Sequence, residues 1–185
     1  MELRDDQVVR YSRQLLLREV GGAGQRALLS AAVSTRGRGP ALEVAVAYLA
    51  ASGVAVHAAP GAGGFGALNP DAQQPEGRHV TVLLGTPPAP QASWQGPAVW
   101  MGAVGDTLRL LLLSAEGCGA CAARELERLG PVPPGPLSVL SGAHAALAVQ
   151  RLLLGWLGSA PALIEVGASG ETRPSALERC EDHRP

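Results

Sequence analysis

The alternation of apolar runs with breaks rich in glycine and proline predicts helices and strands in turn along this chain. Apolar residues at helical spacing predict helices over 5–21, 24–32, 41–53 and 140–158. Short continuous apolar runs between glycines and prolines predict buried strands over 54–59, 79–85, 98–104, 108–114 and 162–167. Because strands that alternate with helices are typical of α/β layers, we expect a largely parallel sheet flanked by helices.

Composition sets the size of the domain and excludes some chemistry. The 185 residues allow one domain, and 46 % apolar but only 3 % aromatic residues predict a core of alanine, valine and leucine. A net charge of -1 gives no electrostatic reason to expect nucleic acid or an anionic membrane as a partner. All 15 basic residues are arginines, so no lysine is available as a phosphate clamp or Schiff base.

The N-terminus and the cysteines bear on location. "MELRDDQ" is charged from its second residue, which is not typical of a secretory signal, and the apolar runs are shorter than the ~20 residues of a membrane span. Three cysteines cannot all pair with one another. We expect a cytoplasmic protein.

One glycine-rich stretch has the spacing of a nucleotide loop. Gly61, Gly63 and Gly66 form G-x-G-x-x-G after the strand predicted at 54–59. However, Pro70 and Pro75 follow without helical periodicity, and phosphate binding at such a loop depends on the amides of a helix N-terminus. We therefore interpret 61–66 as a loop and look elsewhere for a nucleotide site.

Four stretches, in order along the chain, resemble the ThiF/MoeB/HesA family, the E1-like adenylyltransferases related to ubiquitin-activating enzymes. They are "RYSRQLLLREVGGAGQRALLSAAV", "EVAVAYLAASGV", "PAVWMGAVGDTLRLLLLSAEGCGACA" and "SGAHAALAVQRLLLG". The resemblance implies one Rossmann-like domain, with N-terminal helices over 1–32 and a shortened core over 33–114. Residues 115–185 would then hold zinc-binding pairs, a helix and a strand.

The resemblance places the nucleotide loop at 37–42, between the first strand and the helix at 41–53. Gly37, Arg38 and Gly39 remain there, but Pro40 removes an amide donor and Leu42 replaces a glycine. The family's ribose acid, triphosphate lysine and magnesium aspartate have no counterparts, and 85–88 reads Gly-Thr-Pro-Pro. We therefore expect a dismantled ATP and magnesium site. Arg38 either attracts an anion or is simply solvated.

Arg13 is retained from the family pattern. The resemblance implies that the second arginine of the first helix reaches the ATP of a neighbouring subunit. Arg13 then either completes a partner's site or lies on a solvated helix face; both interpretations stay open.

Two pairs have the spacing of zinc ligands. Cys118 and Cys121 form C-x-x-C, Cys180 and His183 form C-x-x-H, and together they make a Cys₃His set. The resemblance implies a structural zinc here, with His183 replacing the last cysteine, and it leaves no cysteine for thioester transfer. The alternatives are a redox-labile C-x-x-C or three reduced cysteines without metal.

These observations favour a degenerate E1-like protein, inactive alone, that binds a partner. The partner would be an active E1-like enzyme, a second copy, a ubiquitin-like or sulfur-carrier protein, or a precursor peptide. The alternative is an active ATP-dependent adenylyltransferase that uses Arg13, Arg36 and Arg38 as clamps, with Asp71 and Asp106 as its nearby acids. A redox or metal-sensing module is a third option.

Overall fold

A computed structural model describes residues 2–57, 69, 71, 97–113, 118–156, 162–167, 169–175 and 177, and the backbone of 81–85. The helices in this part of the chain are α1 (Asp5–Arg10), α2 (Ser12–Leu15), α3 (Gly21–Leu29), α4 (Pro40–Ala51), α5 (Gly119–Leu126) and α6 (Pro136–Leu153). The strands are β1 (Ala32–Arg36), β2 (Ala55–His57), β3 (Thr81–Gly85), β4 (Ala98–Val104), β5 (Thr107–Leu113), β6 (Ala162–Val166) and β7 (Thr172–Ser175).

One sheet of seven strands carries the fold, in the order β2-β1-β3-β4-β5-β6-β7. The pairings from β2 to β4 are parallel, and those from β4 to β7 are antiparallel. The prediction of a largely parallel sheet is therefore wrong for the half of the sheet from β4 to β7. Only the two residues Gly105 and Asp106 join β4 to β5, and so short a turn can only make an antiparallel hairpin.

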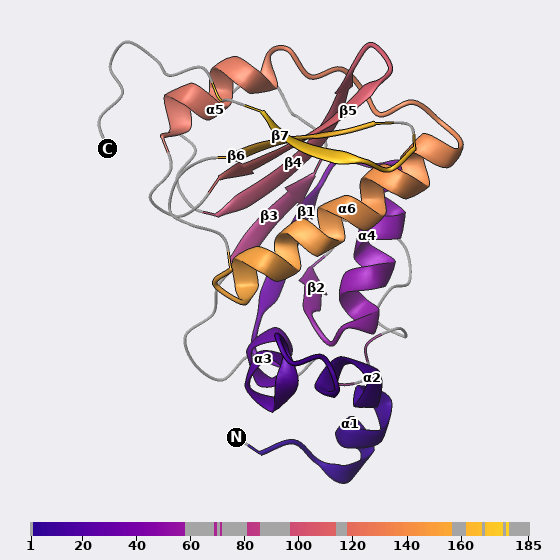
Figure 1. Ribbon diagram of the computed structural model, residues 1–185. Coiled ribbons are helices and arrows are strands. Elements are labelled where there is room, and N and C mark those ends of the chain that lie inside the picture. Colours follow the sequence, from indigo (N-terminus) through magenta and orange to yellow (C-terminus); the bar gives the residue numbers. More distant parts are fainter. Residues whose placement is uncertain are drawn as a thin grey trace.

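The two faces of the sheet bury different helices, as Figure 1 shows, with α4 and α6 on one face and α5 on the other. Alternate residues of β4 and β5 separate accordingly. Val99, Met101, Leu110 and Leu112 pack in the core that contains α4 and α6, whereas Trp100, Leu111 and Leu113 pack with Ala122 and Leu126 of α5. Because alternate residues of β4 and β5 are buried on opposite faces of the sheet, both strands are continuous apolar runs in the sequence.

The helices α4 and α6 cross closely because Gly142 has no side chain. A Cβ placed on Gly142 would lie 2.4 Å from the Ala41 carbonyl oxygen and 2.7 Å from Val44 Cβ. The small residues of α4 and α6 therefore bring the two backbones together and set where α4 begins.

The N-terminal helices differ from the prediction. The segment 5–21 forms α1 and α2 rather than one helix, because Tyr11 (φ -99°, ψ 15°) leaves the helical region between them. Gly21 begins α3 instead of ending a helix. The helix predicted at 140–158 begins earlier, at Pro136, which suits the first helical position, and ends at Leu153.

The remaining predicted elements are confirmed, since α4 and strands β2 to β6 lie within or beside their predicted ranges. Two elements, α5 and β7, have no counterpart in the sequence prediction, and β1 was expected only as the first strand that the resemblance implies. No helix among the described residues combines the length and the apolar character that crossing a membrane requires.

Candidate functional site

A hollow among the described residues lies at the carboxyl end of β1. The chain runs from β1 to β2 on one side, while β3 pairs with β1 on the other, so the strand order reverses at β1. Arg36 at the end of β1 is in register with Gly85 at the end of β3. In open α/β sheets, ligands bind in the crevice outside the strand ends at such a reversal. The loop at 37–42 follows β1, as the resemblance implies.

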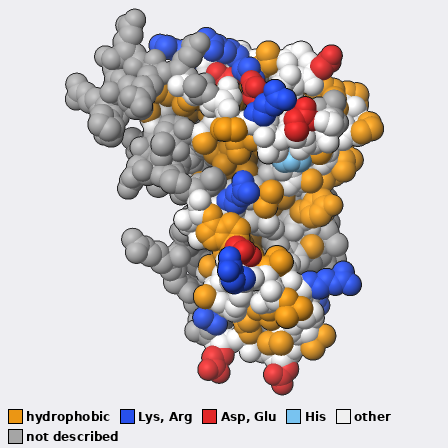
Figure 2. Space-filling model, in the orientation of Figure 1, with side chains coloured by type: hydrophobic (Ala, Val, Ile, Leu, Met, Phe, Trp, Pro, Cys, Tyr) orange, Lys and Arg blue, Asp and Glu red, His pale blue; other side chains and the backbone are white. Residues whose placement is uncertain are grey.

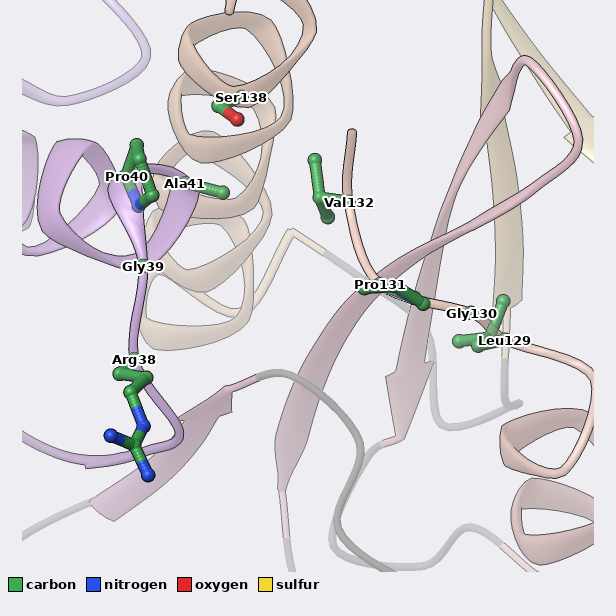
Figure 3. A pocket seen from close by; sticks show the side chains of 9 residues that line it. All are labelled: Arg38, Gly39, Pro40, Ala41, Leu129, Gly130, Pro131, Val132 and Ser138. Carbon is green, nitrogen blue, oxygen red and sulfur yellow. The ribbon is translucent and has the colours of Figure 1, made fainter. Parts of the chain in front are cut away.

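This hollow, called here the β1–α4 pocket, has a volume of about 300 Å³. It is lined by Arg38, Gly39, Pro40, Ala41, Leu129, Gly130, Pro131, Val132 and Ser138. In Figure 3 the loop and the first residues of α4 form one side, and 129–132 forms the other. Ser138, from the first turn of α6, lies between the two sides.

The loop that enters α4 depends on two glycines with left-handed backbone angles. Gly37 has φ +93° and Gly39, the N-cap of α4, has φ +114°, conformations that residues with a Cβ rarely adopt. Pro40 at the first helical position has no N–H, and the Glu43 N–H donates to the Gly39 carbonyl at 3.1 Å. The N–H groups of Ala41 and Leu42 are then the backbone donors of the first turn that have no acceptor within the helix.

The electrostatics of the pocket are those of one exposed cation. Arg38 is the only charged side chain among the described lining residues, and it is exposed. The Ser138 hydroxyl donates to the Pro133 carbonyl at 2.7 Å, so this donor is already used. One guanidinium and two amides at a helix N-terminus suit a small anion.

The opposite side of the pocket is fixed by β4. The Ala103 N–H donates to the Gly130 carbonyl at 3.0 Å, and the Gly130 N–H donates back at 2.8 Å. Gly102 permits this approach, because a Cβ there would lie 2.8 Å from both the Gly130 oxygen and Leu129 Cβ. Sequence reasoning missed this side of the pocket; its signal was the cluster of proline and glycine at 130–135.

The two acids considered for magnesium do not line the pocket. Asp106 lies exposed in the turn between β4 and β5. Asp71 is buried at the N-terminal helices, where Arg4 Nη2 donates to its Oδ1 at 2.7 Å and the Tyr11 hydroxyl donates to Oδ2 at 3.0 Å. Arg10 Nε is 3.4 Å from Oδ2. Asp71 thus holds the N-terminal segment.

The buried cluster around Asp71 was not foreseen from the sequence. The Asp71 N–H donates to the Asn69 side chain at 3.1 Å, and the Asn69 amide donates to the Val54 carbonyl at 2.9 Å, which fixes the turn. Burial and the hydrogen bond to Asp71 raise the pKa of the Tyr11 phenol above its usual range. The sequence Asn-Pro-Asp, typical of such a turn, was the available signal.

Arg13 lies exposed in α2, away from the residues that line the β1–α4 pocket. It therefore does not serve the pocket of its own chain. Its predicted reach toward a partner's ATP is a feature of an assembly and stays a prediction, as does its alternative role on a solvated face.

The first predicted zinc pair lies at the start of α5. Cys118 is the N-cap residue and is half-buried, and Cys121, one turn later, is buried. Cys180, His183 and the 61–66 loop lie outside the described residues. Within the part of the chain that the structure describes, no three His, Cys, Asp or Glu side chains gather as a metal site would require. The donor types suit zinc, and the site stays a prediction.

An ion-pair network fixes α5 to the sheet. Arg109 on β5 donates to Glu125 of α5 at 2.9 Å and to Glu165 of β6 at 2.7 Å, and Glu125 is buried. Arg128 lies 3.7 Å from the other Glu125 oxygen. The C-x-x-C turn thus stands on a helix that is anchored by charge as well as by apolar packing.

The strand reversal at β1, the loop into α4 and the antiparallel edge together make a mixed α/β fold. No protein-family model and no curated protein matches the sequence. Among solved structures, E. coli MccB with SeMet MccA has a TM-score of 0.68 at 14 % identity, covering 97 % of this chain and 74 % of that one. E. coli MccB with ATP gives 0.66 at 15 % identity, covering 94 % and 73 %. PaaA gives 0.61 at 12 % identity, covering 96 % and 76 %.

The likeness at this identity concerns the fold alone. It agrees with the fold that the sequence resemblance implies and extends over nearly the whole chain. What this chain binds or catalyses must be argued from its own residues.

Proposed function

We propose that this chain is a degenerate E1-like protein that acts by binding another protein and does not itself adenylate it. The observation that carries the proposal is the β1–α4 pocket. It includes the loop where the resemblance implies a nucleotide site, yet its described lining has one charged side chain, Arg38, and no carboxylate.

Adenylation demands more charge than this pocket offers. Attack of a carboxylate on the α-phosphate needs cations around the triphosphate, and magnesium needs oxygen ligands such as carboxylates. Arg38 is exposed, Pro40 withholds an amide, and Asp71 is engaged with Arg4 and Tyr11. Removing one oriented donor typically costs roughly 10²–10³-fold in rate, and here several are missing together.

The proposed partners follow from the fold type. They are an active E1-like enzyme, a second copy of this chain, a ubiquitin-like or sulfur-carrier protein, or a precursor peptide. Solved structures of MccB contain MccA, and one is described as a microcin C7 biosynthetic enzyme in complex with N-formylated MccA. Extending a peptide partner to this chain is an analogy of fold, which supports the proposal without identifying the partner.

The alternative function is an active ATP-dependent adenylyltransferase. Two observations favour it: the amides of Ala41 and Leu42 with Arg38 beside them, and the likeness to a structure of MccB with ATP. In this alternative Arg38 would take the place of the missing lysine.

Calorimetric titration of Mg-ATP into the purified protein tests the two functions. For the degenerate protein we expect no heat of binding up to millimolar nucleotide, and no ATP–pyrophosphate exchange with any candidate carrier. A micromolar dissociation constant that weakens about ten-fold in Arg38→Ala, where a direct charged contact is lost, would overturn the proposal in favour of the enzyme. Arg124→Ala, an exposed arginine on α5, is the matched control and should change nothing.

A further inference from the structure

A second hollow lies at the other end of α4 and is apolar. It has a volume of about 320 Å³ and is lined by Gln14, Leu17, Val20, Leu28, Tyr48, Ala51, Ser52, Leu147, Gln150, Leu154 and Trp156. We call it the helical groove, because α3, α4, α6 and the turns after α2 and α6 enclose it. Along α4 the nearest lining residues of the two hollows, Ala41 and Tyr48, are seven positions apart, which is about 10 Å of helix.

The helical groove exposes an unusual share of the molecule's large apolar side chains. Nine such side chains are exposed in the described part of the chain, and four of them line the groove. These four are Leu17 (53 % exposed), Tyr48 (55 %), Leu147 (44 %) and Trp156 (45 %). Leu16, beside Leu17, is still more exposed. Because a contiguous exposed apolar patch marks an interaction site more often than scattered residues do, the groove is a binding surface.

Buried hydrogen bonds fix α3 and the end of α4, two of the elements that enclose the helical groove. The Gln25 amide donates to the Ser52 carbonyl at 2.9 Å, and the Ser52 hydroxyl donates to the Leu49 carbonyl at 2.7 Å. Both side chains are buried, so α3 is fixed against the end of α4. Since the walls are already placed, a partner would enter a preformed groove at little ordering cost.

Charged residues adjoin the lining residues of the helical groove in the sequence. The charged residues next to its lining residues in the sequence are Arg13, Arg18, Glu19 and Arg151, three cations against one anion. Arg151 shares a face of α6 with Leu147 and Leu154, four residues before it and three after it. Arg18 and Glu19, 3.7 Å apart and both well exposed, form a weak surface pair. Figure 2 shows arginine side chains among hydrophobic ones on this side of the molecule.

We propose that the helical groove binds an amphipathic helix of another protein, apolar along one face and acidic beside it. A groove between helices suits apolar side chains spaced three, four and seven residues apart. The acidic flank would meet Arg13, Arg18 and Arg151. A second copy of this chain fits less well, because it would bring arginines against arginines, and like charges across an interface oppose association.

The proposal does not depend on whether the β1–α4 pocket binds nucleotide. Each surface has its own residues and its own test. Failure at one leaves the result at the other intact.

A pair of synthetic helical peptides tests the charge and the shape of the occupant. Both are blocked, alanine-based peptides of about 15 residues with leucines at helical spacing; one carries glutamates and the other lysines beside the leucines. Binding is followed by the anisotropy of a labelled peptide. We expect the glutamate peptide to bind at least about ten-fold more tightly at low salt, and this preference to shrink at high salt.

Substitutions locate the binding. Leu147→Ala should weaken the glutamate peptide at least ten-fold, and Val139→Ala, an equally exposed apolar residue of α6 outside the groove, should not. Arg151→Glu should abolish the preference for the glutamate peptide, whereas Arg124→Glu on α5 should leave it unchanged. Circular dichroism verifies that each variant is folded.

Three results would overturn the proposal. The first is equal affinity for the two peptides, or none for either. The second is an equal loss in Leu147→Ala and Val139→Ala. The third is a dimer, seen by sedimentation, that Leu147→Asp dissociates, because a second copy would then be the occupant of the groove.

Discussion

At the scale of single residues, the N-terminal segment buries hydrogen-bonding side chains and exposes apolar ones, the reverse of the usual pattern. Gln7 and Tyr11 are buried around Asp71, while Val9 and Leu16, on the same segment, are exposed. The segment is therefore attached to the domain through a buried carboxylate and offers apolar side chains outward. A buried polar cluster is costly unless its members are bonded to one another, and here Asp71 accepts from three side chains.

Tyr11 predicts a dependence of stability on alkaline pH. Its pKa is raised in the folded protein by burial and by Asp71, so the unfolded chain loses the phenolic proton at lower pH than the folded one. The unfolded state then binds fewer protons, and the free energy of unfolding should fall as pH rises above the ordinary tyrosine pKa of about 10. Urea unfolding between pH 8 and 11 measures this fall.

The matched control is Tyr11→Phe, which removes the titrating group but keeps the ring. Because the chain has no lysine, few other groups titrate in this range, and the difference between the two proteins reports Tyr11. The variant should be less stable at pH 8 and should lose less stability between pH 9 and 11. Parallel curves for the two proteins would show that the Tyr11 hydroxyl is not held as described.

At the scale of elements, the sequence identified those whose signal is local. Small apolar residues at helical spacing predicted α4, and continuous apolar runs predicted β4 and β5. The direction of a strand is not local: β5 was placed but not recognised as antiparallel, although Gly105 and Asp106 leave room for a hairpin only. The helix α5 was not predicted, because the C-x-x-C was interpreted as a metal-binding pair although Cys121, Ala122 and Leu126 have helical spacing.

The candidate site likewise has one part that the sequence could indicate and one part that it could not. The resemblance implied a nucleotide loop at Gly37, Arg38 and Gly39. Arg38 and Gly39 line the β1–α4 pocket, and their binding of a nucleotide stays a prediction. The wall at 129–132 depends on a bridge between Ala103 and Gly130 that spans residues distant in the sequence. Such pairing leaves no periodic pattern, so it could not be predicted from one sequence.

The crossing of α4 and α6 predicts a sensitive glycine. Gly142→Ala would place a Cβ 2.4 Å from the Ala41 carbonyl oxygen, and the helices would have to move apart. Overpacking costs about 1–3 kcal/mol, which exceeds the ~1 kcal/mol that alanine gains over glycine in a helix. Urea or thermal unfolding should show a net loss of stability.

Gly22→Ala in α3 is the matched control. A Cβ there would meet only the end of the Arg26 side chain, at 3.5 Å, so the helix preference of alanine should dominate and stability should rise slightly. If both variants lost stability equally, the close approach at Gly142 would not be the cause in α6.

At the scale of the whole molecule, the features that bear on function are the shared fold and the two hollows beside α4. The chain shares the fold of MccB over nearly its full length, and Arg38 is the one charged side chain among the described residues that line its β1–α4 pocket. The two hollows are similar in volume but differ in lining: one includes the cation Arg38, and the other has no charged side chain in its lining.

The predicted zinc would join the two ends of the C-terminal third of the chain. Cys118 and Cys121 stand at the start of α5, which Arg109 and Glu125 anchor to the sheet, and Cys180 and His183 complete the predicted set. A metal bound by four such ligands stabilises the folded state, since the unfolded chain does not present them together.

Elemental analysis of protein purified without chelator should therefore find one zinc per chain. Cys118→Ser and Cys180→Ser should each reduce that ratio sharply, and a chelator should lower the melting temperature of the parent protein but not of these variants. His144→Ala is the control, because His144 bonds the Leu140 carbonyl within α6 and lies outside the predicted set. A ratio well below one, or a ratio that both serine variants retain, would leave the two pairs as reduced thiols or a redox pair, and the C-terminal third would then be held by Arg109 and apolar packing alone.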